Sequence, residues 1–273
     1  MNVKTILFPT DFSEIASNAL DFAAAVASKL EANLLFLHVN SQTYAAPARE
    51  SGNIPLESIN NSMVNEKLAS VLSDVALKYG ISCRSHLEEG DPEQIIPKVA
   101  SNAQADLLIM GTLGYTESEE IPTDSLTTRV MDKTTLPMLI IPRDARYDSL
   151  DRWLYAFDRL EKEKGVMEQV FQLATSLSAT VELLHVKTNR QDGDQDHLTL
   201  DNISQHLPGI RAGFKVINGD SVLEGLSHYI DTAQPDLLVM SRHDRSFFER
   251  MFNRDIVKTA ANQINFPLLV LHG

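Results

Sequence analysis

The chain has 273 residues, of which 43% are apolar and 22% charged, and its formal net charge is −13. This length accommodates two domains of ordinary size, and the acidic charge disfavours nucleic acids and anionic membranes as partners. The single cysteine, Cys83, excludes a disulfide within the chain and a structural cysteine zinc site. The apolar runs are only strand-length, and the N-terminus enters an apolar strand without a signal-peptide pattern. We therefore expect a cytoplasmic protein without a membrane span.

Strand-like and helix-like segments alternate along the first half of the chain. Short apolar runs predict strands at 5–9, 33–39, 82–88, 106–110 and 137–142. Apolar residues at helical spacing, together with capping residues, predict helices at 15–30, 56–79, 92–103 and 126–133. This βαβαβαβαβ order is typical of a parallel, doubly wound α/β sheet, for which we expect the strand order 3-2-1-4-5.

The second half repeats the first. Residues 184–186 answer 37–39 at an offset of 147, whereas 235–240 answer 105–110 at an offset of about 130. Each unit is domain-sized, which indicates a tandem duplication rather than a solenoid. We expect two domains, 1–143 and 152–273, separated by a charged stretch. Our hypothesis is that the two five-stranded sheets pack through their last strands as an intramolecular pseudo-dimer. Whether two chains also form a homodimer is left open by the sequence.

A candidate ligand site follows from this topology. Ligands of doubly wound sheets bind where the strand order reverses, here between the first and fourth strands, which brings Asp11 and Gly111 to one crevice. The strand at 106–110 is expected to end at Gly111, Gly114 follows, and Asp124 and Ser125 open the next helix. Glycines allow the backbone to approach an anion, and the N–H groups of a helix start point towards it. The pattern therefore predicts a phosphate seat.

Both halves resemble the universal stress protein family over essentially the whole chain. The residues that carry the resemblance are 6–11, 37–39, 90–92, 106–114 and 125–142. The resemblance implies the adenine-nucleotide alpha-hydrolase-like fold, a regulatory role in the stress response, and ATP or AMP as ligand of the first domain. Gly111, Gly114 and Ser125 would hold phosphates, Asp11 the ribose or base edge, and Val39 the adenine. The implied cofactor-binding residues are Pro9, Thr10, Asp11, Val39, Gly111, Thr112, Gly114, Asp124, Ser125 and Leu126.

Asp124 departs from the family pattern, which has a third glycine at this position. A carboxylate repels each phosphate charge at ~4 Å by roughly 1 kcal/mol in water. Asp124 could instead cap the following helix or hold Mg²⁺ between itself and the phosphates. In the second half, the residues at 241–244 replace the glycine turn, and Asp158 alone survives from the pattern. We therefore expect no nucleotide in that half.

Two alternatives to a nucleotide-binding regulator stay open. One is a nucleotide-free interaction module that uses the apolar stretch 247–252, and the other is a weak metal-dependent ATPase that uses Asp124. No catalytic motif pairs a nucleophile with a base, so we expect no catalytic residues and no dedicated metal site. His38 and His185 occupy the same strand position, which indicates a packing role. Cys83 is expected to be a buried hydrophobic residue.

Overall fold

The computed structural model describes residues 1–41, 56–112, 125–157, 160–188, 212–242 and 267–272. In the first half the elements are β1 (Thr5–Pro9), α1 (Glu14–Leu30), β2 (Asn33–Asn40), α2 (Leu56–Tyr79), β3 (Cys83–Glu89), α3 (Pro92–Asn102), β4 (Leu107–Thr112), α4 (Leu126–Lys133) and β5 (Met138–Pro142). In the second half they are β6 (Arg152–Ala156), α5 (Leu160–Ser176), β7 (Thr180–Lys187), β8 (Gly213–Asn218), α7 (Val222–Ala233), β9 (Leu237–Ser241) and β10 (Leu268–Leu271).

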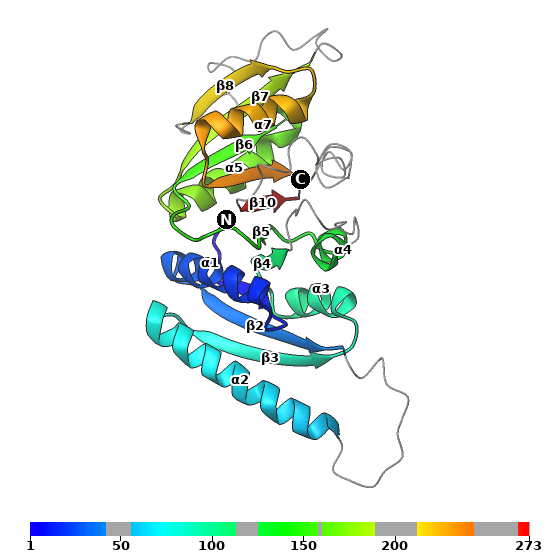
Figure 1. Cartoon of the computed structure of the whole chain (residues 1–273). Coiled ribbons are helices and arrows are strands. Elements are labelled where there is room, and N and C mark those ends of the chain that lie inside the picture. Colours follow the sequence, from blue (N-terminus) through cyan, green and yellow to red (C-terminus); the bar gives the residue numbers. More distant parts are fainter. Residues whose placement is uncertain (42–55, 113–124, 158–159, 189–211, 243–266, 273) are drawn as a thin grey trace.

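All described strands belong to one sheet, in the order β3-β2-β1-β4-β5-β10-β9-β6-β7-β8. Each half has the order 3-2-1-4-5, and every neighbouring pair within a half is parallel. Figure 1 shows the two halves one above the other, with their sheets joined edge to edge. The predicted doubly wound α/β fold with two five-stranded units is confirmed.

Within the described residues, the strands of the two halves join through one antiparallel pair. Leu268, Leu269 and Val270 of β10 lie opposite Ile140, Leu139 and Met138 of β5. Two parallel sheets related by a twofold axis must run in opposite directions where they join, and this pair does so. The hypothesis of a pseudo-dimer joined through the last strands is therefore confirmed, and one continuous sheet runs through both halves.

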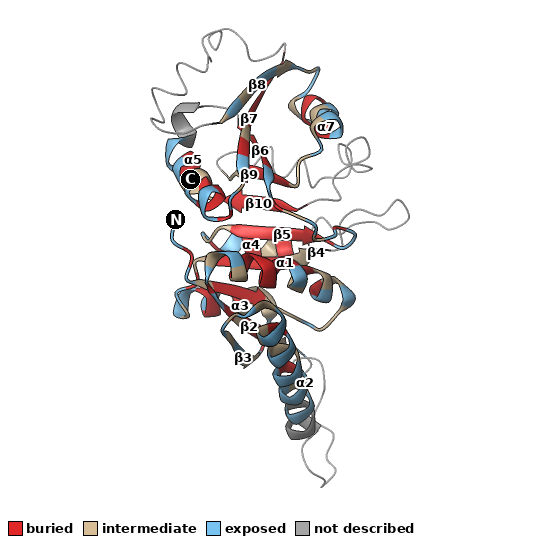
Figure 2. Cartoon of the chain, turned by 90° about the vertical axis from the view of Figure 1, so that its left-hand side faces the viewer, coloured by how far each residue is buried: buried red, intermediate tan, exposed pale blue. Residues whose placement is uncertain are grey.

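Helices cover both faces of the sheet because strand side chains alternate between them. On one face, α1, α2 and α5 pack on strand residues such as Ile6 and Phe36. On the other face, α3, α4 and α7 pack on residues such as Leu7 and Leu108. Each core contains residues of both halves, and Figure 2 shows the buried strands running through the joint between β5 and β10. No helix within the described residues is long and apolar enough to cross a membrane.

The stretch between β5 and β6 packs more closely than its charged sequence indicates. Ala145 and Leu150 are buried. Asn18 of α1 donates its side-chain amide to the carbonyl oxygens of Pro142 and Arg143, both at 3.2 Å. The connection between the two halves is therefore held against α1 rather than standing free as a linker.

Cys83 is less buried than predicted. It lies in β3, the edge strand of the sheet, where only one neighbouring strand shields it, and it is half-buried. Burial raises the pKa of its thiol, which disfavours the reactive thiolate.

Candidate functional site

A cleft opens at the carboxyl ends of β1 and β4, where the strand order of the first half reverses. Its volume is about 230 Å³. The lining residues come from the ends of β1, β2 and β4 and from the starts of α1, α3 and α4: Pro9, Thr10, Asp11, Ser13, Ile15, Ala16, Leu37, Val39, Pro92, Ile96, Met110, Gly111, Thr112, Ser125, Leu126 and Thr127. The floor is mainly aliphatic and the rim carries hydroxyls and one carboxylate.

The turn after β1 fixes Asp11 at the rim. Asp11 Oδ1 accepts a hydrogen bond from the backbone N–H of Ser13 at 2.9 Å, and Ser13 in turn caps α1 by accepting from the N–H of Ala16. Thr10 Oγ1 accepts from the N–H of Phe12, whose φ of 62° lies in the left-handed region. Asp11 is exposed and lines the cleft, and carboxylate oxygens accept hydrogen bonds.

A histidine anchors the same turn from β2. His38 Nδ1 lies 2.8 Å from the carbonyl oxygen of Thr10 and must donate, since a carbonyl only accepts. The ring also packs against Phe12 at 4.9 Å between centroids. In the second half His185 Nδ1 makes the corresponding contact with the carbonyl of Phe157 at 3.3 Å, and the rings lie 5.6 Å apart. Both histidines thus tie a strand end to its neighbour, in agreement with the predicted packing role.

Gly111 lies inside β4 and not in a turn after it. The prediction that the strand ends at Met110 is wrong, because Gly111 and Thr112 continue the pairing with β5. A Cβ at position 111 would lie 2.7 Å from Ile15 Cγ2 and 2.9 Å from the Ile15 carbonyl oxygen. Glycine is therefore required here because the first turn of α1 packs directly on β4, whatever the cleft binds.

The start of α4 closes the opposite side of the cleft. Ser125 is its N-cap and accepts from the N–H of Thr128 at 3.2 Å, whereas Asp124, the alternative cap, lies outside the described residues. Thr127 donates its hydroxyl to the carbonyl oxygen of Gly111 at 3.0 Å. The first N–H groups of a helix have no intrahelical acceptor and carry partial positive charge. An anion at this end of the cleft would therefore meet suitable donors.

An ion-pair cluster holds α3 and α4 together beside the cleft. Glu93 of α3 accepts from Arg129 Nε at 2.8 Å and is also paired with Lys133. The hydrogen bond from Lys133, followed by its charge and by Arg129, lowers the pKa of the Glu93 carboxyl below its usual value of 4.5, against a smaller opposing effect of desolvation. The pair therefore stays ionised at neutral pH and helps to fix the angle between the two helices.

The structure brings most of the predicted site residues together. Those that line the cleft are Pro9, Thr10, Asp11, Val39, Gly111, Thr112, Ser125 and Leu126. Gly114 and Asp124 lie outside the described residues, and so does the phosphate-side loop between them. Their role in binding stays a prediction.

Several lining residues were not predicted. The apolar floor contains Ile15, Leu37, Ile96 and Met110. The helical spacing of Ile15 and Ile96 marks them as inward-facing, but the sequence pattern does not tell which end of the core they border. Pro92 belongs to the 90–92 stretch noted in the sequence and could have been assigned to the site from the topology.

In the second half, Asp158 and residues 243–266, which include the 247–252 stretch, lie outside the described residues. A different cavity of about 370 Å³ lies in this half between the ends of β7 and β8 and the helix α7. It is away from the β6–β9 switch point. Within the part of the chain that the structure describes, no three His, Cys, Asp or Glu residues form a group that could hold a metal ion.

The fold and the cleft define a class of protein: a doubly wound α/β protein with its candidate site at the topological switch point. Comparison with protein families identifies the class more closely. The model of the universal stress protein family matches residues 2–142, and the chain therefore belongs to this family.

Relatives of known sequence and structure agree with this assignment. The chain is similar to two universal stress proteins of Methanocaldococcus jannaschii. It is 29% identical to MJ0577 over 158 residues, which cover 51% of this chain and 95% of the relative. It is 27% identical to MJ0531 over 142 residues, which cover 51% of this chain and 82% of the relative. The crystal structure of a universal stress protein from Archaeoglobus fulgidus covers 100% of this chain and 99% of its own with a TM-score of 0.76 at 17% identity, which shows a common fold.

Proposed function

We propose that the first half binds an adenine nucleotide, ATP or AMP, in the cleft between β1 and β4, and that the protein acts as a regulatory stress protein through this site. The observation that carries the proposal is the convergence of Asp11, Val39, Thr112 and Ser125, from four separate elements or turns, on one cleft. Membership of the universal stress protein family supports the proposal, because the resemblance assigns nucleotide contacts to these same positions.

The chemistry of the cleft is suited to a nucleoside with an anionic tail. The aliphatic floor around Leu37, Val39 and Met110 offers a surface for a base. Asp11 would accept a hydrogen bond from a ribose hydroxyl or the adenine amine. The N–H groups at the start of α4 and the Ser125 hydroxyl would face phosphate.

We further propose that the chain comprises two domains, 1–143 and 152–273, and that only the first holds nucleotide. The end of β5 at Pro142 and the start of β6 at Arg152 support these boundaries. Ser241 and Arg242 stand where Gly111 and Thr112 stand in the first half, so these residues of the proposed site are not repeated in the second half.

Isothermal titration calorimetry of the full chain with ATP and AMP, each with and without Mg²⁺, tests the proposal. Ser125→Ala and Asp11→Asn should weaken binding, because each removes a polar contact; one hydrogen bond to a charged group is worth roughly 1.5–3 kcal/mol, or about tenfold or more in affinity. Ser221→Ala is the matched control, since Ser221 caps α7 in the second half and accepts from the N–H of Glu224 at the same distance of 3.2 Å. Nucleotide that binds wild type and Ser125→Ala equally, or binds neither, would refute the proposal.

If Mg²⁺ changes the ATP affinity of the wild type but not that of Asp124→Gly, the metal is assigned to Asp124. Release of phosphate from ATP above background by the wild-type protein would instead favour the ATPase alternative. Both measurements use the same preparation as the calorimetry.

A further inference from the structure

Arg242 occupies a position in the second half that corresponds to Thr112 of the cleft in the first half. It follows Ser241, the last residue of β9, and its backbone N–H donates to the carbonyl oxygen of Leu271 in β10 at 2.8 Å. Only 12% of its side chain is exposed. A guanidinium so far removed from water needs charged or hydrogen-bonding partners.

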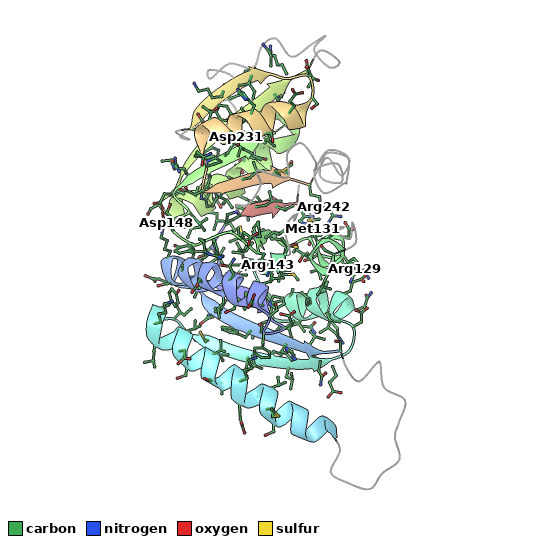
Figure 3. All side chains as sticks on the ribbon, in the orientation of Figure 1. Arg129, Met131, Arg143, Asp148, Asp231 and Arg242 are labelled. Atoms are coloured by element: carbon green, nitrogen blue, oxygen red, sulfur yellow. The ribbon has the colours of Figure 1, made fainter. Side chains whose placement is uncertain are left out.

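The partners of Arg242 lie in the other half of the molecule. One terminal nitrogen donates to the carbonyl oxygen of Met131, and the other pairs with the carboxylate of Asp132. Both acceptors belong to the last turn of α4, and Figure 3 shows Arg242 and Met131 next to each other where the halves meet. The last carbonyls of a helix lack intrahelical donors and carry partial negative charge, which favours a cation there. A planar guanidinium can serve both acceptors at once.

The opposite end of the same helix lines the cleft. α4 has eight residues and is therefore about 12 Å long, too short to bend appreciably. At its start Ser125 and Leu126 line the cleft, and Thr127 is bound to the Gly111 carbonyl. A shift of its carboxyl end would consequently move its first turn relative to β4.

The cations of the other ion pairs on α4 are more exposed than Arg242, although its partner Asp132 is itself 43% exposed. Arg129 and Lys133, which hold α4 to Glu93, have side chains 35% and 36% exposed. Solvent weakens exposed pairs more than shielded ones. The contact with Arg242 is thus a polar restraint that reaches this helix from the other half of the chain.

We propose that Arg242 is a positioning residue for the cleft of the first half: by holding the carboxyl end of α4, it makes nucleotide affinity in one half depend on contact with the other. This inference rests on the proposed nucleotide binding. It also gives the second half a role that does not require a ligand of its own.

Two measurements on the full chain test the inference. The first is ATP affinity by calorimetry, and the second is hydrogen exchange of the α4 amides in the absence of nucleotide. Arg242→Met keeps an apolar stem and removes both donors, whereas Arg242→Lys keeps the charge. The control is Arg152→Met, since Arg152 pairs with Asp236 at 3.0 Å within the second half and does not contact α4.

We expect Arg242→Met to weaken ATP binding about fivefold or more, the lower end of typical coupling between sites. It should also speed exchange in α4 while α1 exchanges as in the wild type. Arg242→Lys should restore part of the affinity, and Arg152→Met should change neither measurement.

Unchanged ATP affinity in Arg242→Met would overturn the inference even if α4 exchanged faster. Equal loss of affinity in Arg152→Met would also overturn it, because the effect would then reflect general destabilisation of the second half. If the wild type bound no ATP, the proposed function would fail separately. In that case faster α4 exchange in Arg242→Met would still support positioning of the helix, and unchanged exchange would overturn it.

Discussion

Replacement of Gly111 by alanine provides a test of how β4 and α1 fit together at the cleft. The added Cβ would lie 2.7 Å from Ile15 Cγ2, whereas non-bonded carbons are optimally separated by about 3.5–4.0 Å. The Ile15 carbonyl oxygen at 2.9 Å is backbone and cannot rotate away. The first turn of α1 must therefore move, or β4 must bend. Overpacking of this kind costs typically about 1–3 kcal/mol, and the rigid backbone contact places Gly111→Ala towards the upper end.

The assay is urea unfolding followed by far-UV circular dichroism and by the fluorescence of Trp153. Trp153 is the only tryptophan and is buried in β6, so its signal reports on the second half. Because both cores run across the joint, we expect the two signals of Gly111→Ala to shift together to lower urea.

Two further variants make this prediction specific. Gly165→Ala in α5 adds the same methyl group where nothing lies within 4 Å, and it should stabilise the protein by about 0.5–1 kcal/mol. Ile15→Ala combined with Gly111→Ala should recover only part of the loss, since it removes the Cγ2 contact but keeps the carbonyl. An unchanged or higher unfolding midpoint for Gly111→Ala would refute the reasoning.

Three further predictions concern protonation and hydrogen bonding. The folded-state pKa of Glu93 is lowered, so its stabilisation is present above pH 4.5 and is lost as the pH falls through that lowered value; Glu93→Gln should remove this acid-dependent part of thermal stability. His38→Leu leaves the Thr10 carbonyl without its donor and should cost about 0.5–1.5 kcal/mol in urea unfolding, whereas His38→Asn should retain much of the bond. Burial, followed by the hydrogen bond and charge of Glu182, raises the pKa of Tyr229 to about 12, so Tyr229→Phe should remove one tyrosine step near pH 12 from an absorbance titration.

The sequence predicted helices and strands well where the residues that determine them lie within the same helix or strand. The bounds of α4 agree with the prediction because the Ser125 hydroxyl and the apolar spacing of Val130 and Met131 act within the helix itself. The strand order followed from the alternation of elements, and with it the meeting of Asp11 and Gly111 at one cleft. Such inferences need only the chain direction and the rules of parallel sheets.

The predictions failed where a residue's role depends on a contact with a residue distant in the sequence. The reason for a glycine at 111 is Ile15, which local pattern cannot reveal, and so the residue was assigned to a turn. The contact between Arg242 and Asp132 joins positions separated by 110 residues. A sequence pattern shows that Arg242 replaces a cleft residue, but it does not show what the arginine binds instead.

The repeat retains the contacts that hold the strands and changes those around the cleft. Asp106 accepts from the backbone N–H groups of Lys4 and Thr5 at 2.7 and 2.9 Å, and Asp236 accepts from those of Asp151 and Arg152 at 3.1 and 3.0 Å.

These carboxylates tie the first and fourth strands of each half together at their amino ends, and His38 and His185 tie the first and second at the carboxyl ends. At the position of Thr112, by contrast, the second half carries an arginine directed at the first. The two halves thus share these strand contacts, whereas Arg242 contacts α4 of the first half, which is the arrangement expected if one half binds ligand and the other holds the site in shape.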